Sequence, residues 1–369
     1  MTFKKHIKQM IIYVICLALC GCLAGCSGTE GGIEADQAHP SPQEETTQTS
    51  DPEDVPSCEG QIFAMDTYMS IKCYGEGCEE ALEAARAEIT RLEELLSVGI
   101  DTSEIAVINR EGKGTVSKDT AEIIEKALEI WDTTDGAFDI TIYPVMAEWG
   151  FTDGDFKVPD RDVLDGLLEH VGSGLIIYDK DASSVELGDA LGIDLGGIAK
   201  GFTSDRLTQI FEERGLSGAV VSLGGNVQTF GVKPDGSLWK CGVTDPNDES
   251  GLLGIISITD RAVITSGAYE RNFTDEASGK LYHHIIDPST GVSAENGIIS
   301  STIVSKSGIL ADALSTACYV MGLDDSISYW RRYGDDFGMI LMTDDGSLYV
   351  TEDIAGDFKG YYDVTVISR

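Results

Sequence analysis

The sequence has few positively charged residues. Its 369 residues include 26 lysines and arginines against 63 aspartates and glutamates, a formal net charge of −37. A surface of this kind repels the phosphates of nucleic acids and of anionic lipid headgroups. The composition therefore argues against nucleic acid as a partner and against electrostatic adhesion to membranes, although it does not identify a substrate.

Residues that bind metals through nitrogen or sulfur are also scarce. The chain has five histidines, and only His170, His283 and His284 lie beyond residue 57. The cysteines form no paired CxxC units, so a zinc or iron–sulfur site is not expected. An odd number of cysteines follows residue 26, and a disulfide between Cys73 and Cys78 is one open alternative.

The apolar run near the start of the chain is too short to span a bilayer. Residues 11–19 follow three lysines and have the length of a signal-peptide core. Leu23-Ala24-Gly25-Cys26 then matches a lipobox. We expect residues 1–25 to be removed as a lipoprotein signal peptide and Cys26 to carry lipid. The lipid would anchor the protein to the extracytoplasmic side of a bacterial membrane. An uncleaved signal anchor is the alternative.

Apolar residues are almost absent from residues 28–56, which are rich in Glu, Asp, Thr, Ser, Gln and Pro. Such a segment cannot bury enough surface to offset the entropy lost on ordering. We predict that residues 26–57 comprise the lipidated cysteine and a disordered acidic tether. Residues 58–369 are long enough to form a large core, as one domain or two lobes.

Neither a repeat of fixed period nor a regular alternation of strands and helices is visible. Periodicity and turn residues predict helices over residues 79–96, 119–131, 201–214 and 307–321. They predict strands over residues 61–73, 175–178, 184–187 and 191–194, a meander over 219–223, 228–232, 239–243, 254–258 and 262–265, and strands near Met339 and Leu348. Helices mixed with hairpins favour an α+β fold.

One glycine-rich turn stands out in a chain that has neither a Walker loop nor a GxGxxG fingerprint. Asp194-Leu195-Gly196-Gly197-Ile198-Ala199-Lys200-Gly201 leads from a predicted strand into a predicted helix. Free backbone N–H groups at a helix start suit a diphosphate, and Lys200 adds positive charge. The alternative is a tight turn that needs small residues.

A second candidate lies on the helix that contains Ala311-Asp312-Ala313-Leu314-Ser315-Thr316. Asp312 and Thr316 are four residues apart and share one face. A carboxylate beside a hydroxyl is a pair of hard oxygen ligands suited to Mg²⁺. The alternative is a threonine that bonds back to its own helix.

A third candidate is Tyr282-His283-His284-Ile285-Ile286-Asp287-Pro288-Ser289-Thr290-Gly291. His284 and Asp287 could supply a general base and its partner, with geometry fixed by a turn at Pro288 to Gly291. Surface histidines beside a turn are the alternative. Met65-Asp66-Thr67 and residues 134–139 also contain carboxylates, and nothing intrinsic makes either a site.

Taken in order, these segments resemble the ApbE-type flavin transferases, the FAD:protein FMN transferases of bacterial envelopes. The resemblance covers nearly all of residues 62–369. Its motifs are weak singly but specific as an ordered set. They are Met65-Asp66-Thr67, Glu94-Leu95-Leu96-Ser97 with Asn109, Gly136-Ala137-Phe138-Asp139 with Pro144 and Trp149-Gly150-Phe151, residues 194–201, Ser222-Leu223-Gly224-Gly225-Asn226, Tyr269-Glu270-Arg271, residues 284–291 and residues 311–316.

The resemblance implies an ApbE-like (T-fold-like) α+β fold, in one large two-lobed domain with largely antiparallel sheets. It implies an enzyme that splits the diphosphate of FAD, releases AMP and esterifies FMN to a Thr or Ser hydroxyl of another protein. The Ala199 carbonyl and the side chains of Asp312 and Thr316 would hold Mg²⁺, and His284 would deprotonate the acceptor hydroxyl. FAD would contact Met65, Ala137, Phe138, Asp139, Gly196, Phe202 and Ile286.

Two residues depart from the family pattern. Asp66 stands where the family has glycine, which removes backbone freedom from that turn. Gly99 stands where an aromatic ring is common, which predicts a looser clamp on the flavin or adenine. The competing interpretations are an FAD pyrophosphatase that releases FMN and AMP, and a non-catalytic flavin-binding lipoprotein. The acceptor would be a membrane or secreted redox protein.

Overall fold

The computed structural model describes residues 55–369. The predicted signal peptide, Cys26 and nearly all of the predicted tether lie outside the described residues. Among the helices of residues 55–369, none has the length and apolar character needed to cross a membrane.

A nine-stranded sheet forms the centre of the described domain. Neighbouring strands in this sheet are antiparallel, except for the parallel pair β15 and β17. In spatial order the strands are β1 (Ser57–Ala64), β2 (Thr67–Tyr74), β6 (Gly218–Leu223), β7 (Asn226–Gly231), β10 (Ala262–Gly267), β13 (Ile298–Ser305), β14 (Phe337–Thr343), β15 (Leu348–Thr351) and β17 (Val364–Ile367).

Three small sheets and a set of helices surround the large sheet. The small sheets are β16 (Phe358–Gly360), β9 (Asp248–Ile258) and β8 (Trp239–Asp245); β3 (Lys113–Thr115), β5 (Ser184–Glu186) and β4 (Ile177–Asp179); and the hairpin β11 (Asn272–Thr274) with β12 (Leu281–His283). The helices are α2 (Cys78–Leu96), α3 (Glu104–Glu111), α4 (Lys118–Thr133), α5 (Tyr143–Glu148), α6 (Arg161–Leu168), α7 (Ala199–Glu213), α8 (Gly308–Met321), α9 (Leu323–Tyr333) and α10 (Glu352–Ala355), with short 3₁₀ turns at Ile140–Ile142 and Ser173–Leu175.

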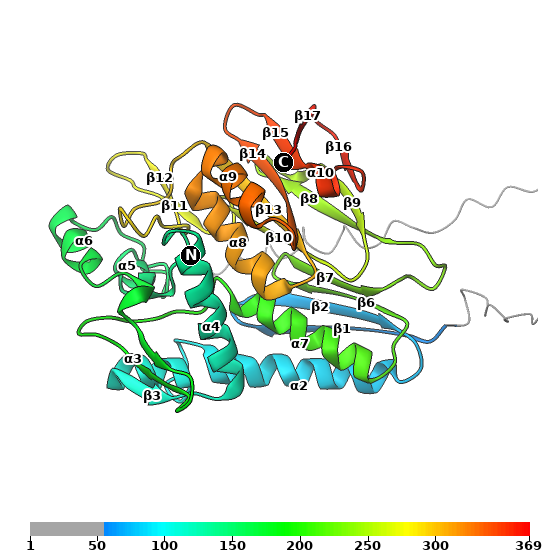
Figure 1. The fold of residues 1–369 in the computed structure, drawn as a ribbon, viewed down its shortest axis with the longest axis horizontal. Coiled ribbons are helices and arrows are strands. Elements are labelled where there is room, and N and C mark those ends of the chain that lie inside the picture. Colours follow the sequence, from blue (N-terminus) through cyan, green and yellow to red (C-terminus); the bar gives the residue numbers. More distant parts are fainter. Residues whose placement is uncertain (1–54) are drawn as a thin grey trace, which may run out of the picture. The chain divides into compact units, whose positions relative to one another are not determined.

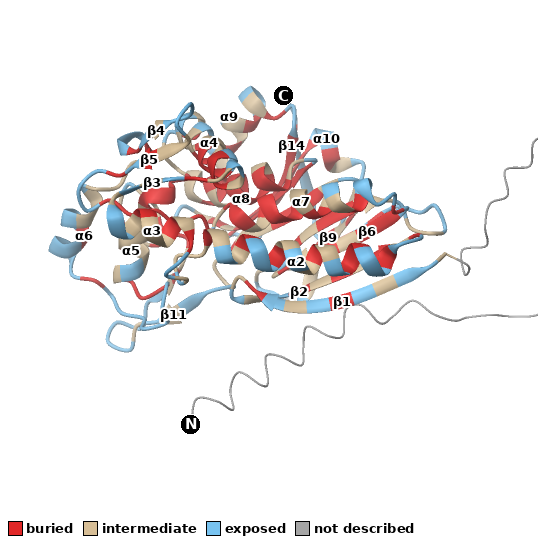
Figure 2. Cartoon of the chain, turned by 90° about the horizontal axis from the view of Figure 1, so that it is seen from below, coloured by how far each residue is buried: buried red, intermediate tan, exposed pale blue. Residues whose placement is uncertain are grey.

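The large sheet has a core on each face because its side chains alternate between the faces. On β10, Ala262 and Ile264 join the core that includes α8, whereas Val263 joins the core formed with β8 and β9. Helices α2, α7 and α8 cover one face, and α2 and α7 run side by side (Figure 1). Figure 2 shows that α8 is largely buried, whereas α2 exposes its outer side. The mixture of helices and largely antiparallel sheets confirms the predicted α+β class.

The strand predicted over residues 61–73 is wrong, because it is two strands joined by a tight turn. β1 and β2 pair from Ala64 opposite Thr67 outward, leaving Met65 and Asp66 as the turn residues. Their φ angles are 49° and 59°. Both residues therefore adopt the left-handed conformation of a two-residue hairpin turn, which aspartate tolerates better than most residues. Asp66 thus forms the turn without the glycine of the family pattern.

Two further predictions fail for identifiable reasons. Residues 191–194 form no strand, because Ile193 pairs through both its N–H and its carbonyl with the Asn109 side chain, each at 2.8 Å. The predicted meander is divided: β6, β7 and β10 lie in the large sheet, whereas β8 and β9 form a separate one. The central strand β13 and helix α9 were not predicted.

A disulfide closes the start of the domain, and it is not the pair considered from the sequence. Cys58 on β1 bonds to Cys78 at the start of α2, with their Cα atoms 5.7 Å apart. Cys73 lies directly opposite Cys58 on β2 and remains a buried free thiol. The two cysteines that are close in sequence are therefore not joined to each other.

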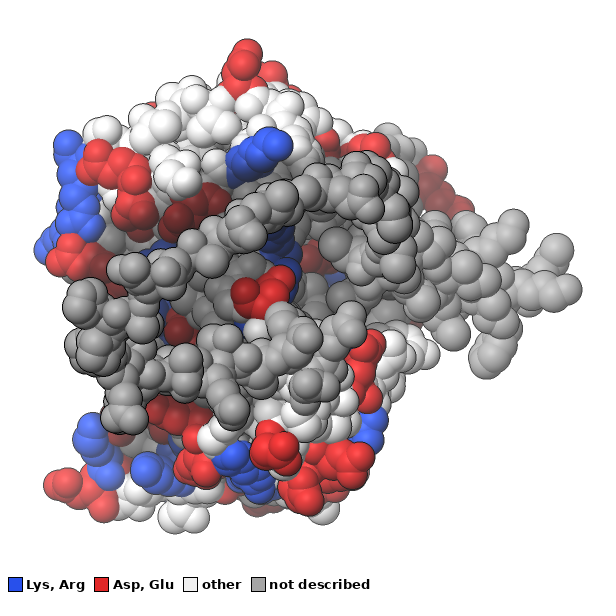
Figure 3. All heavy atoms as spheres, turned by 90° about the vertical axis from the view of Figure 1, so that its right-hand side faces the viewer, with Lys and Arg blue, Asp and Glu red and all other residues white. Residues whose placement is uncertain are grey.

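The acidic composition is visible at the surface. On the face drawn in Figure 3, the visible acidic side chains lie interspersed with basic ones.

Candidate active site

Helices α7 and α8 cross closely at two glycines. A Cβ atom on Gly201 would overlap the Gly308 carbonyl oxygen and lie 2.6 Å from Asp312 Cβ, and a Cβ on Gly308 would overlap Ser204. Only glycine at both positions lets the helices approach this closely. The crossing brings Asp312 of α8 against the first turn of α7.

Two donors hold the Asp312 carboxylate, which is 5% exposed. The Gly201 N–H donates to its Oδ2, and the Asn226 side-chain amide donates to its Oδ1, each at 2.8 Å. The glycine-rich turn and the Asp312 helix, which are 111 residues apart in sequence, therefore meet as the sequence predicted. Two N–H groups orient a buried carboxylate while leaving it further lone pairs.

Other oxygen atoms gather near Asp312. Thr316 Oγ1 lies 3.2 Å from Ser266 Oγ. The Ala199 carbonyl accepts a hydrogen bond from Thr203 Oγ1 at 2.8 Å and keeps a second lone pair for a metal ion. Residues 55–369 contain no cluster of three or more His, Cys, Asp or Glu suited to a metal. A carboxylate, a hydroxyl and a carbonyl fit Mg²⁺, which completes its shell with water and phosphate oxygens.

The start of α7 carries positive charge that suits an anion. Its N-cap residue, Ile198, makes no side-chain cap, and the first turn contains Lys200 and no acidic residue. Gly196 is exposed, and its N–H donates to Asp194 Oδ1 at 2.9 Å. The surrounding protein desolvates the Asp194 carboxyl group and raises its pKa, which Gly196 and Lys200 partly offset. The N–H groups that the sequence led us to expect free are largely occupied, because those of Ile198 and Ala199 donate to the Leu195 carbonyl and that of Gly201 donates to Asp312. The positive end of the helix and the Lys200 side chain still favour a phosphate here.

Two segments with predicted FAD contacts pack against this turn and the helix that follows it. A Cβ atom on Gly197 would lie 3.1 Å from the Phe138 ring, so Phe138 packs beside the turn. Met65 reaches α7 from the β1–β2 hairpin, with its Sδ 4.0 Å from Thr203 Oγ1. Asp139, in contrast, is buried and accepts hydrogen bonds from Thr141 and Ser173, so its carboxylate is occupied within the fold.

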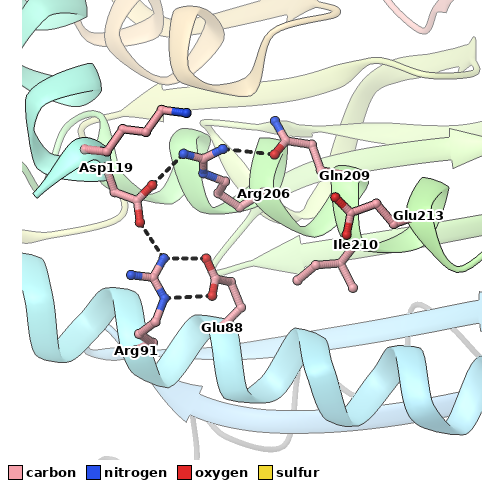
Figure 4. A pocket seen from close by; sticks show the side chains of 8 residues that line it. Glu88, Arg91, Asp119, Arg206, Gln209, Ile210 and Glu213 are labelled. Atoms are coloured by element: carbon pink, nitrogen blue, oxygen red, sulfur yellow. Dashed lines mark hydrogen bonds and ion pairs between the residues drawn. The ribbon is translucent and has the colours of Figure 1, made fainter.

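Phe202 offers a ligand little besides its backbone. Its side chain is 1% exposed, and the Arg206 guanidinium lies 4.8 Å from its ring centre. Figure 4 shows Arg206 between Asp119 of α4 and Gln209 of α7, beside a hollow of about 360 Å³. Asp119 also pairs with Arg91, and Arg91 pairs with Glu88. These paired charges fix α2, α4 and α7 around the buried Phe202.

His284 follows the β11–β12 hairpin and is oriented by Arg271 at the other end of that hairpin. Its Nδ1 lies 3.1 Å from the Arg271 carbonyl oxygen, which only accepts hydrogen bonds. Nδ1 therefore carries the proton, and Nε2 keeps a free lone pair. The ring is partly exposed, but desolvation by the surrounding protein and repulsion from Arg271 lower its pKa to about 3. His284 is consequently neutral at physiological pH.

Stacked aromatic rings pack against this hairpin. Phe273 of β11 and Tyr282 of β12 stack at 5.7 Å, and the buried Trp149 packs 4.8 Å from Tyr282. The Trp149 indole N–H donates to the Gly291 carbonyl at 2.7 Å. This packing fixes the hairpin that carries Arg271 and His284.

The described hydrogen bonds do not pair Asp287 with His284. Asp287 Oδ1 instead accepts from the N–H and the hydroxyl of Ser289, at 2.8 and 2.7 Å. The carboxylate therefore stabilises the turn, and the carbonyl of Arg271 orients the histidine. Ile286 is 5% exposed and belongs to the small core around Trp149.

The sequence assigned no role to Glu270 and Arg271, which the structure places near Lys200 and His284. The electrostatic environments of Asp194, Glu270 and His284 all include both Lys200 and Arg271, so these groups share one site. Glu270 is exposed at the surface, yet the protein around its carboxyl group and the nearby Asp312 raise its pKa to about 7. The Tyr269-Glu270-Arg271 segment was recognised as a motif in the sequence. The structure adds that its charged residues lie near Lys200 and His284.

Comparisons with known proteins agree with this geometry. The ApbE family model matches residues 65–341. A FAD:protein FMN transferase of Treponema pallidum (strain Nichols) is 31% identical over 295 residues, which cover 73% of this chain and 80% of that protein. One of Klebsiella pneumoniae (strain 342) is 30% identical over 285 residues, with 76% and 87% covered. The crystal structure of the ApbE protein from Thermotoga maritima is similar with a TM-score of 0.76 at 32% identity, covering 82% of this chain and 99% of that one. The flavin transferase ApbE from Vibrio cholerae gives 0.73 at 25% identity, with the same coverage.

Proposed function

Since this chain belongs to the ApbE family and is a FAD:protein FMN transferase, we propose that it uses Mg²⁺ to transfer FMN to a Thr or Ser hydroxyl of an extracytoplasmic redox protein. The observation that carries this proposal is the hydrogen bond from Gly201 N–H to Asp312 Oδ2. It joins the first turn of α7, whose positive helix end suits a diphosphate, to a carboxylate suited to a metal ion.

We assign each step of the reaction to particular residues. The turn at Gly196 and the start of α7 bind the diphosphate of FAD, with Lys200 and Arg271 offsetting its charge. His284 Nε2 takes the proton from the acceptor hydroxyl. The hydroxyl oxygen then attacks the phosphorus of the FMN half, the bond from that phosphorus to the bridging oxygen breaks, and AMP leaves with that oxygen.

The low pKa of His284 fits this order of events. In the free protein Lys200 and Arg271 help keep the ring neutral, so Nε2 is available. A bound diphosphate places negative charge near the ring and raises its pKa, which strengthens it as a base. The base is thus activated when the substrate is present.

Asp312, Thr316 and the Ala199 carbonyl would hold the Mg²⁺ ion. When bound, the ion supplies charge neutralisation for the phosphate oxygens in phosphoryl transfer. Asn226 and Gly201 keep the Asp312 carboxylate in place for it.

A flavin-labelling assay tests the proposal against FAD pyrophosphatase activity. The protein is mixed with FAD, Mg²⁺ and a candidate acceptor, and a denaturing gel is scanned for flavin fluorescence. We expect a fluorescent acceptor band that requires Mg²⁺ and the acceptor hydroxyl. Release of FMN and AMP without a labelled acceptor would instead identify a pyrophosphatase.

We also propose that the protein is a lipoprotein anchored at Cys26 outside the cytoplasm. The lipobox Leu23-Ala24-Gly25-Cys26 and the polar segment after it support this proposal. Cys26→Ser should move the protein from the membrane fraction to the soluble fraction and remove metabolically incorporated palmitate. Unchanged membrane association in that variant would contradict lipid anchoring at Cys26.

A further inference from the structure

Asn226 is the only side chain among residues 55–369 that donates a recorded hydrogen bond to the Asp312 carboxylate. The other donor is the backbone N–H of Gly201. No ion pair of the described residues reaches Asp312, so these N–H groups provide its direct compensation for burial. Asn226 is itself 5% exposed and lies at the start of β7.

Two of the sequence motifs fix the position of Asn226. Gly224 and Gly225 form the turn between β6 and β7, with φ angles of 62° and 100°. A Cβ atom on Gly224 would lie 3.0 Å from Thr67 Cβ and closer still to the rest of that side chain, so the turn packs directly on the β1–β2 hairpin. The Gly224 N–H donates to the Tyr68 carbonyl at 3.2 Å. Asn226 is therefore held by backbone that has little freedom to move.

We propose that Asn226 is a positioning residue for the metal site: its amide fixes the plane of the Asp312 carboxylate. This inference rests on the proposed metal role of Asp312. With Oδ1 held by Asn226 and Oδ2 by the first turn of α7, the carboxylate cannot rotate about its Cβ–Cγ bond without breaking a hydrogen bond. Its remaining lone pairs then keep one direction. Groups that hydrogen-bond a metal-binding carboxylate typically change metal affinity by about 10–100-fold when removed.

The motif Leu223-Gly224-Gly225-Asn226 places the Asn226 amide beside Asp312. The two glycines allow the tight turn and its contact with Thr67, and that contact sets where the Asn226 amide lies. The Met65-Asp66-Thr67 hairpin thus acts on the metal site through Asn226, although none of its residues touches Asp312 in the described hydrogen bonds.

The test measures Mn²⁺ affinity by the loss of the free-ion EPR signal on binding, in the full chain without FAD. Asn226→Leu removes the amide at similar volume, and Asn226→Ser removes it while keeping a polar group, in case the first variant does not fold. Gln228→Leu is the matched control, because Gln228 is a buried amide on the same strand that bonds Thr229 and Ser204 rather than Asp312.

We expect both Asn226 variants to bind Mn²⁺ about 10–100-fold more weakly, while Gln228→Leu binds like the wild type. The Mg²⁺ concentration for half-maximal FAD turnover should rise by the same factor, with the maximal rate largely recovered at saturating Mg²⁺. Wild-type Mn²⁺ affinity in a folded Asn226→Ser protein would overturn the inference. If the wild type itself bound no Mn²⁺ and Asp312→Ala changed nothing, the proposed metal site would fail instead.

Discussion

Gly201 and Gly308 face each other where α7 crosses α8, and neither position has room for a Cβ atom. The distance between the two helices is therefore set by the absence of two side chains. Because Gly201 also donates its N–H to Asp312, the same contact sets the distance between the Asp194 to Gly201 turn and the carboxylate.

Gly201→Ala should push the two helices apart. Overpacking of this kind costs about 1–3 kcal/mol, so we expect a lower thermal midpoint. Because the change also displaces Asp312 from the first turn of α7, we expect Mg²⁺ to stimulate FAD turnover less. Gly166→Ala is the control, because that glycine lies in α6 with no atom within 4 Å of its added Cβ. The control should be as stable as the wild type or gain up to about 1 kcal/mol. Equal stability of both variants would contradict the close crossing.

Asp312→Ala should abolish Mg²⁺-dependent turnover of FAD. Loss of the buried Asp312 carboxylate removes the negative ligand, and a metal contributes several kcal/mol to such a reaction, so a loss on the order of 100-fold or more is expected. The measurement is AMP release with and without chelator. Full activity that is insensitive to chelator would show that the metal assignment is wrong.

His284→Ala should retain FAD binding and lose transfer. A general base contributes about 10²–10⁴-fold to the rate, and His284 lies at the end of the hairpin rather than in the diphosphate-binding turn. FAD affinity is followed by flavin fluorescence and transfer by the labelled gel. Asp287→Ala serves as the comparison, since its carboxylate bonds Ser289. Normal labelling by His284→Ala would place the base elsewhere.

FAD affinity measured without metal should depend on pH through Glu270. The pKa of Glu270 in the free protein is about 7, and the protonated, neutral form repels the diphosphate less. Binding therefore takes up a proton, and affinity should fall as pH rises through 7, by at most ~10-fold per pH unit. In Glu270→Gln this dependence should disappear, whereas Glu276→Gln, on the exposed hairpin loop, should keep it. A wild-type affinity that is constant between pH 6 and 8 would refute the assignment.

Loss of the Cys58–Cys78 disulfide should destabilise the domain. A loop of this length contributes about 2–4 kcal/mol through the unfolded state, and Cys58→Ser and Cys78→Ser should lose similar amounts. The free thiol Cys73 takes no part, so Cys73→Ser should retain the bond. Thermal unfolding with and without reductant, and peptide mapping of the disulfide, measure this. A Cys73–Cys78 peptide in the map would contradict the structure.

Local patterns in the sequence were enough to predict the helices around Ala85, Ala127, Leu207 and Ala317, because each has an apolar face with helical spacing. They were not enough for Ile193, whose backbone pairs with a side chain 84 residues away. The two-residue turn at Met65 and Asp66 was missed because alternation continues on both sides of it. Strand β13 was missed because its buried serines and threonines lack the apolar signal of a central strand.

In the candidate site, too, local features could be predicted from the sequence and distant pairings could not. The Asp194 to Gly201 turn and the Asp312/Thr316 pair could be predicted, since helix spacing and glycine content are local properties. The partners of the reactive groups could not: Asn226 reaches Asp312 across 86 residues, and the Arg271 carbonyl, rather than Asp287, orients His284. Such pairings depend on which segments the folded sheet places side by side.

The aromatic packing under the β11–β12 hairpin also gives the protein an optical probe of its own. Trp149 is one of four tryptophans, and it touches the hairpin that carries His284. Indole emission overlaps the absorption of the isoalloxazine ring, so a flavin arriving beside His284 would quench this tryptophan by energy transfer. The arrival and departure of each flavin would thus be readable in real time from unlabelled protein.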